Sequence, residues 1–366
     1  MGRAPGLFVL TPLSTYLYII EMNIIEQTLS NIKIMTCLTM LTLLAACGNK
    51  QNNSTTTTAE PVGPEFSADS AFNFCQQQCD FGPRIMNSEA HEQCAQWIAA
   101  KFREYGMEVT EQKAVLKGYD GTKLNSTNII ASYQPQAKKR ILLCAHWDSR
   151  PWADNDPDEA NWKTPVLAAN DGASGVGVML EIARLISTQD STNTSQASSL
   201  NAQLGIDFIC FDAEDWGTPQ WSDSQEDSGD TWALGAQYWA ASHHKGHKPQ
   251  YGILLDMVGG QGATFYREGF SKRYANDIVN RVWQAAAAIG KSSYFPQEDG
   301  GYITDDHVPV NRLAGVPCID IVPHYPDCEQ SSFGPTWHTV NDDMQHLDRN
   351  TLKAVGQTIV QVLWSE

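Results

Sequence analysis

The chain of 366 residues is acidic, with 25 Lys and Arg against 42 Asp and Glu and a formal net charge of -17 at pH 7. A protein that binds a nucleic-acid backbone needs clustered basic residues, so this balance excludes nucleic acid as an expected partner. With 42% hydrophobic residues and 11 Trp, the composition is typical of a folded soluble enzyme with a sizeable core.

The first 46 residues are interpreted as a signal peptide rather than as part of the fold. The apolar run IMTCLTMLTLLAAC is too short to span a bilayer and ends in small residues before Cys47. The run Leu44 to Cys47 resembles a bacterial lipobox, which implies cleavage before Cys47, lipidation of its thiol and an exported lipoprotein anchored to a membrane and facing the periplasm. An ordinary secretory signal with a chance cysteine is the alternative, and Met22 or Met35 can be the true start.

Residues 47–66 are expected to carry the lipid and to form a flexible tether, because the segment is polar, rich in Thr and punctuated by Pro. A single catalytic domain is expected over residues 67–366. Two of the nine cysteines precede this domain, so seven remain, and at least one thiol is left out of any intrachain disulfides. Cys144 and Cys210 lie in apolar runs, which favours small buried hydrophobic residues.

The hydrophobic patterning predicts helices and strands in alternation. Ser88 to Gly106 has apolar residues at helical spacing, acids in its first turn and Gly at its end, which predicts an amphipathic helix. Strands are expected around Val109, at 126–133, 139–148, 204–212, 251–259 and 315–322. Further helices are expected at 172–186, near 230–241, at 274–289 and at 350–363.

This alternation predicts an α/β fold, a three-layer α/β/α sandwich with a mostly parallel, mixed central sheet. In such sheets, ligands gather at the carboxyl ends of the strands. Polar side chains follow the expected strands or stand in neighbouring loops: His146, Asp148, Asp171, Glu214, Asp215, Asp256 and His338. This set of oxygen and nitrogen ligands without a thiolate suits zinc at a catalytic site with an open position.

Two pairs within this set have separate roles. Glu214 and Asp215 are adjacent, so their side chains point in different directions, and one can bind a metal while the other stays free as an acid or base. Asp148 lies two residues after His146 on the same strand face, where it can orient the imidazole. The sequence leaves open whether His146 and Asp256 bind a second metal or only form hydrogen bonds.

In order and spacing, these motifs resemble the zinc aminopeptidase-like enzymes of the M28 type. The motifs are HxD at 146–148, NDG at 170–172, the acidic pair after FDA, LLD ending at 256 and HT at 338–339, with FGPR at 81–84. Within that family, AHWDSRPW, DDHVPV, GVPCIDIVPHYP and WHTVNDD are more similar to glutaminyl cyclases than to peptidases. The resemblance extends from about Phe66 to the C-terminus.

The resemblance implies a zinc exopeptidase-like fold and the conversion of N-terminal glutamine in peptides and proteins to pyroglutamate, with release of ammonia. It implies one Zn2+ per chain, held by Asp171, Asp215 and His338. The remaining implied roles are Glu214 as general acid and base, Asp256 and Asp305 in a hydrogen-bonded carboxylate network, Trp337 and either Trp216 or Trp221 as pocket walls, and Tyr325 as the aromatic residue of the last loop. A monomer is expected.

Two positions depart from the animal cyclases. Asp215 stands where they carry Glu, and Asp320 stands where they carry His, so the charge near Asp305 must be balanced differently. One rival interpretation is a di-zinc aminopeptidase, for which all five candidate ligands are present. The other is a catalytically inactive binding lipoprotein, against which the intact Glu214 argues.

Overall fold

The computed structural model describes residues 61–191, 199–222, 231–242 and 248–366. These residues lie in one compact unit that extends from Thr58 to Glu366. The expected signal peptide (1–46), the lipidation site Cys47 and most of the expected tether lie outside the described residues. Within the described ranges, no helix combines the length and the apolar character needed to cross a bilayer.

A mixed sheet forms the centre of this unit, in the order β1-β2-β4-β3-β5-β6. The strands are β1 (Glu108–Lys117), β2 (Lys123–Tyr133), β3 (Lys139–His146), β4 (Leu204–Phe211), β5 (Tyr251–Leu255) and β6 (Cys318–Ile321). β4, β3, β5 and β6 are mutually parallel, whereas β2 is antiparallel to both of its neighbours. The mostly parallel mixed sheet predicted from the patterning is therefore confirmed.

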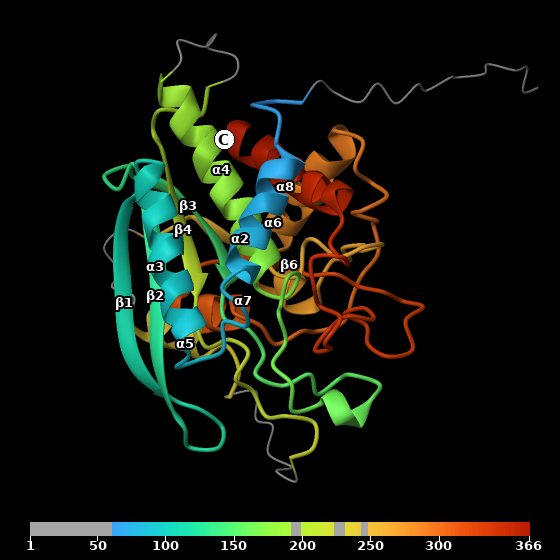
Figure 1. Ribbon diagram of the computed structural model, residues 1–366. Coiled ribbons are helices and arrows are strands. Elements are labelled where there is room, and N and C mark those ends of the chain that lie inside the picture. Colours follow the sequence, from blue (N-terminus) through green and yellow to red (C-terminus); the bar gives the residue numbers. More distant parts are fainter. Residues whose placement is uncertain (1–60, 192–198, 223–230, 243–247) are drawn as a thin grey trace, which may run out of the picture. The chain divides into compact units, whose positions relative to one another are not determined.

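Helices cover both faces of the sheet (Figure 1). One layer contains α2 (Ala68–Cys79), α3 (Glu89–Glu104), α4 (Ala173–Ser191), α6 (Gly269–Ala288) and α8 (Arg349–Trp364). The other contains α5 (Leu234–Ser242), α7 (His307–Pro309) and the π-helical turn Val310–Ala314. β3 illustrates the division, because Leu143 packs in the first layer's core and its neighbours Leu142 and Cys144 pack in the second. The three-layer sandwich is confirmed.

Helix starts follow capping side chains. Ser88 caps α3 by accepting a hydrogen bond from His91 N, at the start of the helix predicted from Ser88 to Gly106. The helix predicted at 274–289 begins earlier, at Gly269, because Glu268 accepts hydrogen bonds from two amides of its first turn. A short 3-10 helix, η1 (Glu159–Asn161), interrupts the long loop after β3.

The seven cysteines from Cys75 to Cys328 are free thiols. Six of them are buried, and Cys328 is partly exposed. Cys144 lies inside β3 and Cys210 inside β4, both fully buried, as the apolar runs predicted. The described part of the chain therefore owes its stability to the packed core and its hydrogen bonds rather than to disulfides.

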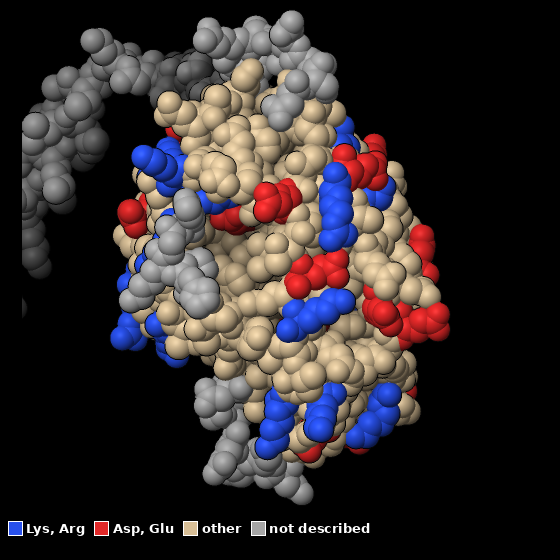
Figure 2. Space-filling view, turned by 90° about the vertical axis from the view of Figure 1, so that its left-hand side faces the viewer, with Lys and Arg blue, Asp and Glu red and all other residues tan. Residues whose placement is uncertain are grey.

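The outer edge of β1 carries charged side chains. Glu111 forms ion pairs with Arg103 of α3 and with Lys113, at 2.9 and 3.6 Å. Figure 2, which views this side of the unit, shows basic and acidic side chains interspersed over the surface. Charged side chains on an exposed strand edge disfavour pairing with a second sheet.

The carboxyl ends of β3, β4 and β5 lie at one edge of the sheet, where these strands end at His146, Phe211 and Leu255. Helix α4 packs so closely against the end of β5 that a Cβ on Gly175 would lie 2.1 Å from Leu255 O, which explains the glycine at this position. The loops that leave this edge carry the polar residues predicted for the site.

Candidate active site

A cavity of about 580 Å³ opens where these loops meet. Its lining includes the predicted residues Asp171, Glu214, Asp215, Asp256, Asp305, Trp337 and His338. A second cavity of about 570 Å³, between α3 and the β1–β2 hairpin, contains none of them. The chemistry of the lining therefore identifies the first cavity as the candidate active site.

Asp171, Asp215 and His338 form a compact group whose ligand atoms lie within 4.8 Å of one another. His338 Nε2 lies 3.1 Å from Asp215 Oδ1 and 3.5 Å from Asp171 Oδ2. Both carboxylate oxygens of Asp215 are buried and accept no hydrogen bond of good geometry from the described residues. Two converging carboxylates and an imidazole, with buried oxygens left unpaired, fit a zinc ion.

The electrostatics of this group also fit a cation. Burial raises the pKa of Asp171 to about 6, and the nearby charge of Asp215 adds to the shift. Burial alone would lower the pKa of His338, but the charge of Asp215 and the contacts with Asp215 and Asp154 together outweigh it, and the pKa rises to about 9. Both shifts reflect concentrated negative charge, which a bound metal would neutralise.

Two further buried aspartates hold the backbone of the carboxylate ligands. Asp148 accepts hydrogen bonds from the amides of Glu214 and Asp215, each at 3.1 Å. Asp342 accepts hydrogen bonds from the amides of residues 170 and 171, at 2.7 and 3.0 Å. Partners of this kind fix the orientation of metal ligands. Asp342 was not among the site residues predicted from the sequence.

His338 is held by a third aspartate. Its Nδ1 lies 3.5 Å from Asp154 Oδ1, and Asp154 in turn pairs with the buried Arg150 at 2.7 Å. Burial would raise the pKa of Asp154, but His338 and Arg150 lower it well below its ordinary value. An ionised carboxylate on Nδ1 leaves Nε2 to face the two ligand carboxylates.

The His146 side chain lies among the carboxylates of Asp148, Asp171 and Asp256. Its Nε2 lies 2.9 Å from Asp171 Oδ1 and 3.1 Å from Asp256 Oδ1, and its Nδ1 lies 3.5 Å from Asp148 Oδ1. Burial would lower the pKa of His146, but its contacts with these three aspartates raise it well above its ordinary value. The ring can donate hydrogen bonds to these carboxylates, and ligand-type atoms of His146, Asp171 and Asp256 also lie within 4.8 Å of one another.

Glu214 lines the cavity and lies outside the ligand groups. Burial raises the pKa of its carboxyl group well above the ordinary value, with the charge of Asp215 as the second cause. A buried carboxyl group with a raised pKa, beside a metal group, is the kind of residue that exchanges protons with a substrate.

The backbone around these residues is strained. Ala213, Met257 and His338 have φ angles of 53, 52 and 53°, in the left-handed region that side chains rarely adopt. Gly172 has a φ of 100°, and a Cβ there would lie 2.7 Å from Asp148 O, which explains glycine in the NDG motif. Strain of this kind clusters at functional sites, where it directs side chains.

Asp305 borders the cavity, with Asp320 and His307 buried behind it; ligand-type atoms of the three lie within 4.8 Å of one another. Burial raises the pKa of Asp305 to about 7, and the charge of Asp256 adds to it. Burial, then the charge of Asp305, raises the pKa of Asp320 well above its ordinary value. The raised pKa favours the neutral form of Asp320, which would lower the negative charge beside Asp305.

Two tryptophans flank the metal group. The ring of Trp337 stacks on the His338 imidazole with a centroid distance of 3.9 Å, and Trp232 lies parallel to the same imidazole at 6.1 Å. Both line the cavity. Arg150 lies 4.6 Å from the centre of the Trp232 ring, a cation–π contact that fixes this wall.

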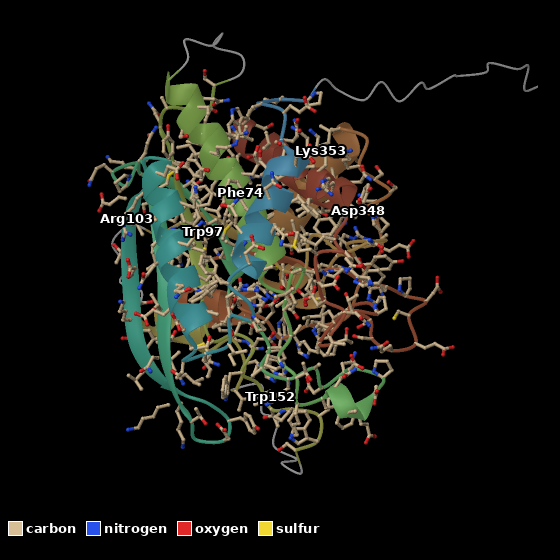
Figure 3. The ribbon with its side chains drawn as sticks, in the orientation of Figure 1. Phe74, Trp97, Arg103, Trp152, Asp348 and Lys353 are labelled. Atoms are coloured by element: carbon tan, nitrogen blue, oxygen red, sulfur yellow. The ribbon has the colours of Figure 1, made fainter. Side chains whose placement is uncertain are left out.

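The expectation that Trp216 or Trp221 forms a wall needs correction, because neither lines the cavity. Trp216 packs against Trp152 at 5.3 Å, and Trp221 stacks with Trp162 at 6.2 Å. Figure 3 labels Trp152, which lies among the loops in the lower part of that view. Trp232, which the sequence analysis did not single out, takes the position.

Tyr325 is also displaced from its expected role. Its hydroxyl group donates a hydrogen bond to Gln261 O at 2.9 Å, and its ring packs so closely on Gly334 that a Cβ there would lie 2.6 Å from the ring. The neighbouring Phe333 lines the cavity instead. Tyr325 therefore packs against Gly334, and the neighbouring Phe333 is one of the aromatic residues that border the cavity.

Residues 128–363 match a family model described as peptidase family M28. A glutaminyl-peptide cyclotransferase of Gloydius blomhoffii is 26% identical over 251 residues, which cover 64% of this chain and 64% of that protein. The match thus spans slightly less than two thirds of that relative's length.

Solved structures give a closer likeness. A Bacteroides thetaiotaomicron glutaminyl cyclase bound to N-acetylhistamine is 50% identical, with a TM-score of 0.78, covering 83% of this chain and 99% of that one. A leucine aminopeptidase precursor from B. thetaiotaomicron VPI-5482 is 49% identical, with a TM-score of 0.77, covering 84% and 100%. The residues that match the family model include Asp171, Glu214, Asp215 and His338, as well as the cavity tryptophans Trp232 and Trp337. This chain belongs to peptidase family M28, and its similar structures include bacterial glutaminyl cyclases.

Proposed function

We propose that this chain is a glutaminyl cyclase, which converts the N-terminal glutamine of peptides and proteins to pyroglutamate and releases ammonia. One observation carries the proposal: Glu214, with its raised pKa, lies in a cavity beside the group of Asp171, Asp215 and His338. The 50% identity to a glutaminyl cyclase over most of the chain supports it.

Asp171, Asp215 and His338 would hold one zinc ion. When bound, zinc supplies positive charge beside the γ-amide oxygen of the substrate glutamine. Asp148 and Asp342, through their hydrogen bonds to the ligand backbone, preset the geometry of the two carboxylates.

Glu214 moves the proton. It accepts a proton from the attacking α-amine and delivers one to the leaving group, so that the bond from the α-nitrogen to the γ-carbonyl carbon forms and the amide bond to ammonia breaks. The raised pKa suits a group that must hold this proton between the two steps. Asp305, and Asp256 through its hydrogen bond with His146, complete the surrounding carboxylate network.

The cavity walls favour cyclisation over hydrolysis. The reaction is intramolecular, so the enzyme must mainly orient the substrate amine against its own side chain. Trp232, Phe333 and Trp337 surround this space with aromatic rings. Aromatic walls around a bound glutamine would limit the access of water that competes with the amine.

A di-zinc aminopeptidase is the second candidate. It is favoured by a second ligand group, His146, Asp171 and Asp256, that shares Asp171 with the first. The glutaminyl cyclases among this chain's relatives and similar structures favour the cyclase over this candidate.

Mass spectrometry of a synthetic peptide with N-terminal Gln distinguishes the two. The zinc-loaded protein from residue 61 onward should remove one ammonia and leave the peptide chain intact, whereas the Glu214→Gln variant should not. Release of the N-terminal residue would establish an aminopeptidase instead. A peptide left unchanged by the zinc-loaded protein would refute both.

We also propose that the chain is exported and anchored by a lipid on Cys47, supported by its LAAC motif and the polar segment that follows. Labelling of cells with a radioactive fatty acid should mark the full-length protein but not the Cys47→Ser variant. Equal labelling of both would refute the anchor.

A further inference from the structure

Glu268 is a buried carboxylate outside the cavity lining, with 1% of its surface exposed. It accepts five hydrogen bonds. Two come from the first turn of α6, through the amides of Phe270 and Ser271 at 2.7 and 2.6 Å, and one from the Ser271 hydroxyl group at 2.7 Å. The other two come from the segment that leads into α7, through Ile303 N at 3.0 Å and through Nε2 of His307, the first residue of α7, at 3.2 Å.

Ile303 and His307 are the two ends of a short segment whose middle residue is Asp305. Ile303 and Asp305 both line the cavity, whereas His307 is fully buried behind them. One carboxylate thus holds both ends of the segment that carries Asp305 into the cavity. A capping residue needs only the α6 amides, so the two contacts with the loop go beyond capping.

The geometry points to Glu268 as a positioning residue for the reaction, which sets the place of Asp305 by holding Ile303 and His307. This inference rests on the proposed cyclase activity. Glu268 acts through the segment and touches no substrate, so its loss should reduce turnover without removing zinc.

A carboxylate is required because its two oxygens together serve five donors. In Glu268→Gln one oxygen becomes an NH2 group, which cannot accept: in place of Oε1 it loses the Phe270 and Ile303 amides, and in place of Oε2 it loses the Ser271 donors and His307 Nε2. Burial would raise the pKa of Glu268, but His307 and the Ser271 contacts lower it to about 2, so the native acceptor is ionised. The substitution therefore removes charge and acceptor together.

A double-mutant cycle with Asp305→Asn tests the inference. Glu268→Gln should lower kcat by ~10- to 100-fold, the effect of a displacement of about 1 Å at a catalytic group, with little change in KM. In the Asp305→Asn background the same substitution should have almost no further effect on kcat. Glu181→Gln is the matched control, since Glu181 is also fully buried and paired with Arg184 but lines no part of the cavity.

Independent effects of the two substitutions, each multiplying the other's loss, would overturn the inference. So would an equal loss of kcat in Glu181→Gln, which would indicate general loosening of the fold. If Glu268→Gln does not fold, His307→Gln, which releases only one end of the segment, takes its place in the cycle with the same expected coupling. A wild-type protein that does not cyclise refutes the proposed function instead.

Discussion

Asp148→Asn is expected to weaken zinc binding while leaving the protein folded. In the native protein one buried carboxylate accepts two amide hydrogen bonds, from Glu214 and Asp215 at 3.1 Å each. Asn has one acceptor oxygen, so one amide loses its partner and the other loses a charged one. A hydrogen bond to a charged group is worth about 1.5–3 kcal/mol, so the free energy of unfolding should fall by about 3 kcal/mol. Because the lost bonds orient Asp215, zinc affinity should fall ~10- to 100-fold.

Zinc affinity is measured by competition with a chromogenic chelator, and stability by urea denaturation of the metal-free protein. The matched control is Asp207→Asn in β4: Asp207 accepts two hydrogen bonds from Arg140, at 2.8 and 2.6 Å, and the substitution likewise removes one acceptor oxygen and the charge of the other, well before the carboxyl end of the strand. The control should lower stability without changing zinc affinity. Unchanged zinc affinity in Asp148→Asn, despite lower stability, would refute the role of Asp148 in holding the ligand.

Glu214→Gln should retain zinc but lose ~100-fold or more of kcat, because general acid–base catalysis contributes about that much; normal turnover in steady-state assays would contradict its role. Trp232→Ala should raise KM for the peptide, whereas Trp221→Ala should not, because only Trp232 lines the cavity; equal KM effects would place the wall elsewhere. In protein from residue 61 onward, only Cys328 should react quickly with a thiol reagent, since the other six thiols are buried and burial raises the pKa of Cys94, for example, to about 12. All seven should react after unfolding; a lower count would reveal disulfides.

The sheet could be predicted from the sequence because its signals are local. Apolar runs gave β3, β4 and β5, and the polar residues that follow each run had to meet at the carboxyl edge of a parallel sheet. Asp171 and His338 stand in loops that follow no predicted strand, so the choice of Asp171, Asp215 and His338 as one ligand group depended on the resemblance to M28-type enzymes.

Other parts of the site depend on backbone directions that no periodicity encodes. Trp232 comes well after Asp215 in the chain and precedes Ala233, whose φ of 54° lies in the left-handed region. Asp342 acts by accepting amide hydrogen bonds from a loop distant in sequence, which no residue pattern reveals. Trp216 is nearer to Asp215 in the sequence but packs against Trp152, so sequence proximity misled the prediction.

Titration of zinc into the metal-free protein, with pyroglutamate formation followed at each step, tests most directly whether one metal held by Asp171, Asp215 and His338 serves cyclisation. Activity should rise in proportion to added zinc and level off at one equivalent per chain, and Asp215→Ala should abolish the response. A requirement for two equivalents, or release of the N-terminal residue in place of ammonia, would contradict the one-zinc cyclase and assign His146 and Asp256 to a second metal.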